Sequence, residues 1–318
     1  MADGDGDGVL AGERQACPGS AAVRRLVEAA ALVVALALYA VFGRAQGSGG
    51  GAAALSTLKT ADFHALAFAP DNPDVAFFGH HNGVMRSDDG GKTWQALVDR
   101  RNFDAMGLGV GRGDARTVYL AGHDIFQAST DGGKTWQPVQ HNLPGTDIHG
   151  FAMSPSDPNR LYAYVVGQGT FTSGDGGRTW QRLAGHLPAD VMGMADAGGI
   201  VGAPETLYAS SMGGGVLRST DGGQSWSSAM GTLGRRGVLA LAADPAAPQT
   251  LYAGLEGSGL YKTTDGGGTW TRLPFPGQNP VAIAVSLARP QRLLALDFKN
   301  REGLVYRSDD GGATWGAR

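Results

Sequence analysis

The eight residues from Ser87 to Trp94, SDDGGKTW, decide the fold of this chain. Close copies of this octet recur five more times along the 318 residues, and together they contain all six tryptophans. Successive copies begin 42, 44, 46, 44 and 45 residues apart. A fixed period in the forties indicates one supersecondary unit that is repeated. The copies are STDGGKTW at Ser129–Trp136, SGDGGRTW at Ser173–Trp180, STDGGQSW at Ser219–Trp226, TTDGGGTW at Thr263–Trp270 and SDDGGATW at Ser308–Trp315.

The composition of the octet is typical of a tight turn between two strands. Its third residue is always an aspartate, whose carboxylate can accept hydrogen bonds from backbone N–H groups two or three residues further on. Two glycines follow, and they adopt backbone angles that a Cβ atom would make costly. The tryptophan buries a large ring against the sheet. We therefore interpret the six aspartates as structural rather than catalytic: Asp89, Asp131, Asp175, Asp221, Asp265 and Asp310.

Each repeat contains four short runs that read as strands. In the first repeat we expect strands within residues 64–70, 75–80, 84–87 and 94–98, separated by turns and by the octet. Four antiparallel strands per unit, six times over, predict an all-β fold: a six-bladed β-propeller with four-stranded antiparallel blades. Only three residues follow the last octet, so we expect Leu55–Thr60 to supply the fourth strand of the last blade.

Small and large residues alternate along the first strand of every unit. One side of each blade is therefore thin and the other thick, and we expect neighbouring blades to interdigitate. The small residues are Ala65, Gly107, Gly150, Gly193, Ala240 and Ala282, and the larger ones are Leu66, Leu108, Phe151, Met194, Leu241 and Ile283.

The region before the repeats divides by composition. Residues 1–23 are small, polar and rich in Gly and Asp, which is typical of a disordered cytoplasmic leader. Residues 24–42 begin with two arginines and continue as an apolar run, which predicts either a transmembrane signal anchor or a signal peptide. Residues 43–57 have the composition of a flexible linker, and residues 58–318 form the propeller.

The charge pattern predicts where the protein resides. Basic residues ahead of the apolar run keep the N-terminus in the cytoplasm. We expect a single-pass protein of the cell membrane with its propeller on the extracytoplasmic side, or a secreted protein if the leader is cleaved. A formal net charge of −3 gives no general affinity for nucleic acid. The single cysteine, Cys17, leaves the propeller without a disulfide or a thiolate metal site.

Chemistry-bearing residues recur at equivalent positions of the repeats, in two columns that are two residues apart. Residues two apart in a strand share a side, and the first strand of a propeller blade lines the channel. We therefore expect both columns at one mouth of the channel, opposite the octets. The ends of the second strands add histidines there, at positions 80, 81 and 123. The columns are His64, Met106, His149, Met192, Leu239 and Val281, preceded by Asp62, Asp104, Asp147, Asp190, Gly237 and Asn279.

These residue types suit a metal ion. Imidazole with thioether suits copper, while imidazole with carboxylate suits copper(II), zinc or nickel. The sequence therefore supports the hypothesis that an exported propeller binds a copper-like ion at its channel mouth. The alternatives are that these side chains only pack, or that the mouth takes a small polar ligand. The hypothetical metal ligands are His64, His80, His81, Met106, His123, His149 and Met192.

The octet resembles the Asp box, or BNR repeat, of sialidases, sortilin-type receptors, some endoglucanases and photosystem II assembly propellers. Residues 60–315 are also similar to exported bacterial propellers that carry a glycosyl hydrolase label. That likeness rests on Asp62-Phe63-His64-Ala65, Gly79-His80-His81 and Gly122-His123-Asp124. The resemblance implies a propeller of the sialidase-like superfamily, and no single activity.

Two further functions follow from the resemblance. A glycoside hydrolase acting on an extracytoplasmic glycan needs two carboxylates about 5–10 Å apart. The candidates for such a pair are Asp62, Asp104, Asp147 and Asp190. Sialidases usually carry an Arg-Ile-Pro stretch before the first Asp box, and this sequence has none. A protein-binding assembly scaffold is the third possibility. We favour binding over hydrolysis, and expect no cofactor other than the metal ion.

Overall fold

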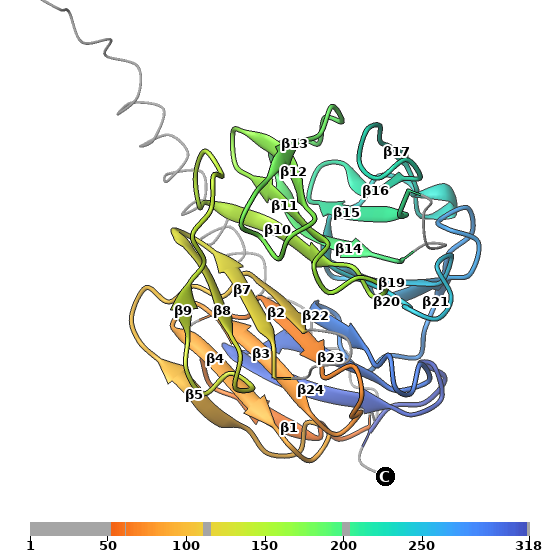
Figure 1. Cartoon of the computed structure of the whole chain (residues 1–318). Coiled ribbons are helices and arrows are strands. Elements are labelled where there is room, and N and C mark those ends of the chain that lie inside the picture. Colours follow the sequence, from red (N-terminus) through yellow and green to blue (C-terminus); the bar gives the residue numbers. More distant parts are fainter. Residues whose placement is uncertain (1–51, 61, 111–115, 199–203, 317–318) are drawn as a thin grey trace, which may run out of the picture. The chain divides into compact units, whose positions relative to one another are not determined.

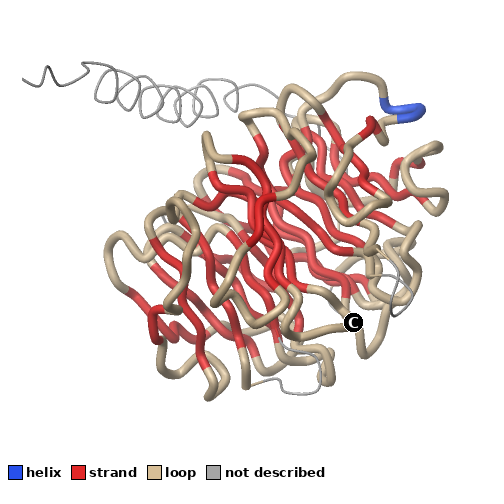
Figure 2. Tube along the Cα trace, turned by 45° about the horizontal axis from the view of Figure 1, so that its top comes forward, coloured by secondary structure: helices blue, strands red, loops and turns tan. Residues whose placement is uncertain are grey.

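The computed structural model describes residues 52–60, 62–110, 116–198 and 204–316. Within these ranges the chain consists of strands and turns apart from one short 3-10 helix, Gly231–Leu233 (Figure 2). The leader and the apolar segment predicted for residues 1–42 lie outside the described residues, as does most of the linker. Among the residues described, no helix has the length and hydropathy that a membrane span requires.

The described strands form six antiparallel sheets of four strands each (Figure 1). The innermost strands are β2 (Ala65–Phe68), β6 (Gly107–Val110), β10 (Ile148–Met153), β14 (Val191–Asp196), β18 (Val238–Ala243) and β22 (Pro280–Val285). The second strands are β3 (Ala76–His80), β7 (Val118–Gly122), β11 (Leu161–Val165), β15 (Leu207–Ser211), β19 (Leu251–Leu255) and β23 (Leu293–Lys299). The third strands are β4 (Gly83–Ser87), β8 (Ile125–Ser129), β12 (Gly169–Ser173), β16 (Gly215–Ser219), β20 (Gly259–Thr263) and β24 (Glu302–Ser308). The outer strands are β5 (Gln95–Asp99), β9 (Gln137–Pro138), β13 (Gln181–Arg182), β17 (Ser227–Ser228), β21 (Thr271–Arg272) and β1 (Ser56–Leu58).

The six sheets form a closed ring. Each innermost strand contacts the next in chain order, and β22 contacts β2. The prediction of a six-bladed β-propeller with four-stranded blades is therefore confirmed. β1 pairs antiparallel with β24, so a strand from the start of the propeller completes the last blade, as the sequence predicts. This strand begins at Ser56 and takes the last two residues of the segment assigned to the linker, 43–57.

Small residues on the innermost strands bring neighbouring blades into direct contact. A Cβ atom added to Gly107 would lie 2.6 Å from Cβ of Phe151 in the next blade. A Cβ atom added to Gly150 would lie 2.7 Å from Cγ of Met194, again in the next blade. At these junctions a large side chain covers a glycine, which is the interdigitation that the alternating pattern predicts.

The Asp-box turns are closed by a recurring set of hydrogen bonds. In the first turn, Asp89 Oδ1 accepts bonds from the backbone N–H groups of Lys92 and Thr93, at 2.9 Å each. These partners lie three and four residues beyond the aspartate, not two or three as expected from the sequence. The nearer N–H, that of Gly91, donates instead to the Ser87 hydroxyl at 2.8 Å. The bond from the residue four positions on recurs in the other five turns.

The Asp-box tryptophans connect adjacent blades. The indole N–H of Trp94 donates to the carbonyl of Gly91 in its own turn, at 3.1 Å. It also lies 3.2 Å from the hydroxyl of Ser56 on β1, the outer strand of the last blade. In the fifth blade, the backbone N–H of Trp270 donates to the hydroxyl of Thr232, which follows the outer strand of the fourth blade, at 2.9 Å. Each of these turns therefore supports its own blade and the preceding one.

An arginine reinforces the closure between the last and the first blade. Arg292, directly before β23, is 7% exposed. Its Nε donates to Asp309 at 2.6 Å, and its Nη1 donates to Asp74 at 2.5 Å. Nη1 also lies 3.2 Å from the carbonyl of Pro73, which with Asp74 belongs to the turn after β2. The guanidinium therefore adds an ionic connection to the strand closure made by β1.

We predict that Arg292→Ala lowers the free energy of unfolding by about 1–3 kcal/mol, because two acidic partners lose a buried donor. The effect stays moderate because Arg289 and Arg307 still lie 3.6 and 3.2 Å from Asp309. Denaturant unfolding followed by tryptophan fluorescence measures it. Lys59→Ala removes the exposed pair with Glu302 and serves as the control, with an expected effect below about 1 kcal/mol. Equal effects of the two variants would contradict the closure role of Arg292.

Because the Asp-box carboxylates accept hydrogen bonds in their ionised form, we expect the fold to lose stability in acid. Hydrogen bonds from the Thr179 hydroxyl and backbone lower the pKa of Asp175 to about 2. A carboxylate with a depressed folded pKa stabilises the fold above its unfolded pKa of about 4, and this stabilisation disappears as pH falls towards 2. Asp175→Asn should therefore lower Tm at neutral pH and shrink the decrease of Tm between about pH 5 and about pH 2.5. The control is Asp71→Asn, which changes an exposed aspartate outside the Asp boxes. If Asp175→Asn leaves the decrease of Tm in acid unchanged, the Asp-box carboxylates are not its cause.

Candidate metal centre

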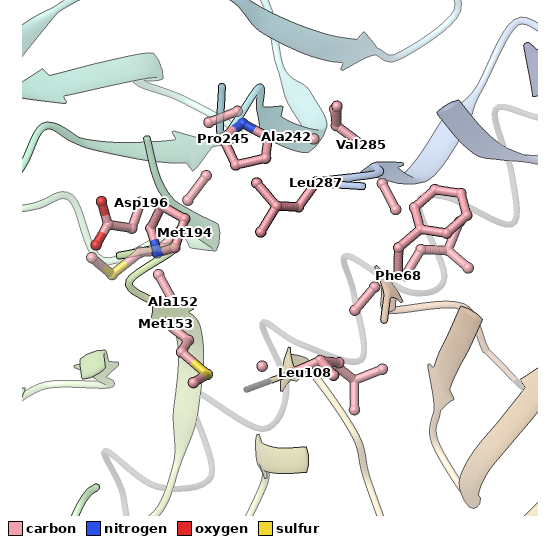
Figure 3. A pocket seen from close by; sticks show the side chains of 18 of the residues that line it. Phe68, Leu108, Ala152, Met153, Met194, Asp196, Ala242, Pro245, Val285 and Leu287 are labelled. Atoms are coloured by element: carbon pink, nitrogen blue, oxygen red, sulfur yellow. The ribbon is translucent and has the colours of Figure 1, made fainter. Parts of the chain in front are cut away.

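The innermost strands line the central channel in three layers of side chains. A cavity of about 100 Å³ lies at the beginning of these strands, and a second of about 210 Å³ lies at their ends (Figure 3). The first is lined by all six residues of the predicted column: His64, Met106, His149, Met192, Leu239 and Val281. The second is lined by Phe68, Val110, Met153, Asp196, Ala243 and Val285, among others. Six apolar residues border both cavities and separate them: Leu66, Leu108, Phe151, Met194, Leu241 and Ile283.

The predicted column lies at the channel end opposite the Asp boxes. Ser87, which opens the first Asp box, pairs with Ala76 at the start of β3. Ala76 in turn pairs with Phe68, the last residue of β2. The Asp boxes are thus at the end of the larger cavity, and His64 precedes β2 at the other end. The structure brings the column together where the sequence predicts.

β-Bulges and strand starts aim these side chains into the channel. The register between β10 and β11 shifts between Ile148 and Gly150, which leaves His149 outside the ladder. The same shift occurs around Met192, and around the equivalent residues of the last two blades. His64 and Met106 directly precede their strands. A bulged residue escapes strand pairing, so its side chain can be re-aimed.

Four histidines and two aspartates form two adjacent clusters. The inner cluster consists of His64, His81 and Asp104. His64 Nε2 lies 3.0 Å from Asp104 Oδ1, and His81 Nδ1 lies 3.0 Å from Asp104 Oδ2. The Asp104 side chain is 4% exposed, while His81 sits on the two-residue turn after β3 and is half-exposed. This cluster therefore surrounds a buried carboxylate.

The outer cluster consists of His123, Asp147 and His149. The Nε2 atoms of the two histidines are 2.9 Å apart, and their rings stack with centroids 4.9 Å apart. Asp147 Oδ1 lies 3.7 Å from the Nε2 atom of His123 and 3.5 Å from that of His149. The three side chains are 24–46% exposed, so a dissolved ion can reach them.

Asp104 connects the two clusters. Its Oδ2 atom lies 3.3 Å from Nδ1 of His123. The backbone of Asp104 passes close to that of residue 122. This close approach requires Gly122, because a Cβ atom there would lie 1.7 Å from the carbonyl oxygen of Asp104. Sequence reasoning did not assign Gly122 a role. The signal for it was the repeated Gly-His pair at the end of the second strands, in Gly79-His80 and Gly122-His123.

Burial and neighbouring charges shift the pKa values of the histidines and aspartates in the clusters. Burial would lower the pKa of His64, but contact with Asp104 and the charges of Asp62 and Asp104 raise it above its ordinary value. Burial would raise the pKa of Asp104, but His64, His123 and His81 lower it. Burial lowers the pKa of His123 in spite of Asp104. His123 therefore favours the neutral imidazole that a metal ion requires.

His80 does not join either cluster. Its side chain is buried, its ring stacks on Phe78 with centroids 5.7 Å apart, and its Nδ1 accepts the backbone N–H of Asn82 at 3.3 Å. These contacts give His80 a packing role in the turn after β3.

Two of the predicted aspartates also lie outside the clusters. Asp190 accepts hydrogen bonds from the hydroxyl of Ser211 at 2.6 Å and from the backbone N–H of Gly213 at 2.5 Å, which holds a loop. Asp62 is exposed, and its carboxylate lies 3.9 Å from His64 Nε2. Asp104 and Asp147, proposed as carboxylates of an enzyme, are the two that the structure places among the histidines.

The outer cluster has the dimensions of a transition-metal site. Three donor atoms separated by 2.9, 3.5 and 3.7 Å lie on a circle of about 2 Å radius, close to the bonds of about 2.0–2.2 Å that zinc forms with imidazole nitrogen and carboxylate oxygen. Two imidazoles and a carboxylate suit copper(II), zinc and nickel. Asp104 beside Nδ1 of His123 provides the carboxylate that usually orients a metal-binding histidine.

Comparison with known proteins identifies the repeats and the fold. The BNR/Asp-box repeat model matches residues 85–96 and 127–138. No curated protein matches the sequence. A GH74 xyloglucanase from Xanthomonas campestris is 21% identical, with a TM-score of 0.56 over 82% of this chain and 46% of its own. The GH74 enzyme of Niastella koreensis is 16% identical, with a TM-score of 0.54 over 81% and 47%. YCF48 from Cyanidioschyzon merolae is 17% identical, with a TM-score of 0.50 over 79% and 96%.

These similarities concern architecture. The chain spans slightly under half of the length of the two GH74 structures, and identities this low show the fold alone. The repeated Asp boxes, the six four-stranded sheets and the structural neighbours agree with one another. The chain is a six-bladed β-propeller built from BNR/Asp-box repeats.

Proposed function

We propose that this propeller is a metal-binding protein whose outer cluster holds a divalent transition-metal ion, with copper(II) as the first candidate. The observation that carries the proposal is the spacing of His123 Nε2, His149 Nε2 and Asp147 Oδ1, at 2.9–3.7 Å from one another. Copper(II) leads because it binds a given nitrogen and oxygen donor set most tightly among the first-row divalent ions. Met106 and Met192 line the cavity that His64 and His149 also line, and thioethers suit copper(I).

Export and membrane attachment belong to the same proposal. The support for them is the apolar run within residues 24–42, which two arginines precede. A propeller without cysteine would bind a copper ion outside the cytoplasm through imidazole, carboxylate and thioether donors only. The role that fits this arrangement is capture of a metal ion at the membrane surface.

The hydrolase alternative has less support from the four carboxylates that the sequence predicts for it. A glycosidase needs one carboxylic acid whose pKa is raised so that it donates a proton. The pKa of Asp104 is lowered instead by its histidines, and Asp190 is bound within a loop. A protein partner on the same face remains the other alternative, because a polar propeller face suits it as well.

We predict that His123→Ala/His149→Ala loses the tightest copper equivalent. Loss of a group that only orients a metal ligand lowers metal affinity roughly 10–100-fold. Because the double variant loses two ligands themselves, its affinity for copper should fall by at least this factor. The full-length protein is freed of metal with a chelator, dialysed against Cu²⁺ and desalted. Bound metal is then counted by mass spectrometry, and affinity is measured by chelator competition.

The matched control is His141→Ala/His186→Ala, which removes two histidines of loops after outer strands. His141 Nδ1 accepts the backbone N–H of Leu143, and neither histidine belongs to a cluster of the described residues. The control should bind copper like the original protein. Equal binding by both double variants, or no stoichiometric copper in the original protein, rejects the proposal.

A further inference from the structure

The inner cluster contains buried donor atoms that the outer site does not use. Asp104 is 3% exposed, and His64 Nε2 faces its Oδ1 at 3.0 Å. Both atoms are buried and form an ion pair with each other, and among the described residues neither has a further hydrogen-bond partner. His81 approaches the same carboxylate from the exposed side.

We propose that His64, His81 and Asp104 hold a second divalent transition-metal ion beside the first, so that the channel mouth carries a two-ion centre. This inference rests on the function proposed for the outer cluster. Apart from this ion pair the two atoms have no polar partner, and a buried polar atom with incomplete partners destabilises the fold. A cation between His64 Nε2 and Asp104 Oδ1 satisfies both atoms at once, and the ligand atoms of the inner cluster lie within 4.8 Å of one another.

The donor set of the inner cluster matches that of the outer cluster. Each consists of two imidazoles and one carboxylate, contributed by neighbouring blades. His81 and His123 occupy equivalent hairpin turns. His81 follows the second strand of the first blade, and His123 follows the second strand of the second blade. Both sites should therefore accept the same class of ion, with nitrogen and oxygen donors.

The contact between Asp104 and His123 couples the two sites. Asp104 Oδ2 lies 3.3 Å from His123 Nδ1, so the carboxylate that binds the inner ion also orients a ligand of the outer ion. An inner ion withdraws negative charge from Asp104 and thereby weakens His123 as a donor. The two cations also repel each other. The ions should therefore bind in two steps, with the second at least about tenfold weaker than the first.

The test uses Cu²⁺ alone, added to the full-length protein at mildly alkaline pH, where imidazole is neutral. Mass spectrometry should count two copper ions per chain, and electron paramagnetic resonance should show the half-field signal of two neighbouring copper(II) ions. His81→Ala removes a half-exposed ligand, and His64→Gln roughly keeps the volume of a buried one. Each should bind one copper and lose the half-field signal, and His141→Ala should keep both.

The outcomes separate this inference from the proposed function. One copper per chain, retained by His81→Ala and His64→Gln and lost in His123→Ala/His149→Ala, overturns the second site and leaves the first. Two coppers without magnetic coupling also overturn it, because the ions are then not neighbours. No bound copper in the original protein rejects both proposals together.

Discussion

The contact between each Asp-box turn and the blade before it is the constraint on which the remaining structure depends. A single four-stranded sheet buries neither face alone, so a blade is stable only between two neighbours. Trp94 carries this contact across the closure of the ring, through Gly91 in its own turn and Ser56 on β1. The carboxylate of the box holds the turn in the shape that presents the indole. The aspartates are therefore repeated for architecture, and the metal site that we propose lies at the opposite end of the channel.

Closing the ring is what gives the histidines a common neighbourhood. His64 and His149 are 85 residues apart in the sequence, yet both line one cavity because equivalent positions of successive blades face one axis. The apolar layer beneath them separates this mouth from the larger cavity at the other end. Polar side chains at the mouth thus lie between water and an apolar floor, where electrostatic interactions are stronger than in bulk water. This setting explains how one buried carboxylate, Asp104, keeps three imidazoles close.

Much of this arrangement follows from the sequence, and the rest depends on contacts that a pattern does not contain. The period of the Asp boxes predicts the blades, and the alternation of the first strands predicts the column at the mouth. The aspartate column predicts Asp190 at the mouth, and the end of a second strand predicts His80 there. In the structure each side chain accepts a hydrogen bond from a nearby backbone N–H and lies outside the two clusters. The bulge at His149 interrupts the pairing of β10 with β11, and Asp104 is buried once the ring has formed. Residue spacing within one strand carries no information about either.

The most direct test of the account is anomalous diffraction from crystals of the full-length protein grown with copper, recorded at the copper absorption edge. The account predicts a peak at about bonding distance, roughly 2.0–2.2 Å, from Nε2 of His123, Nε2 of His149 and a carboxylate oxygen of Asp147. Anomalous density only at histidines outside both clusters, such as His141, or none within the channel mouth, would contradict it. The propeller would stand in that case, and the purpose assigned to its histidines would not.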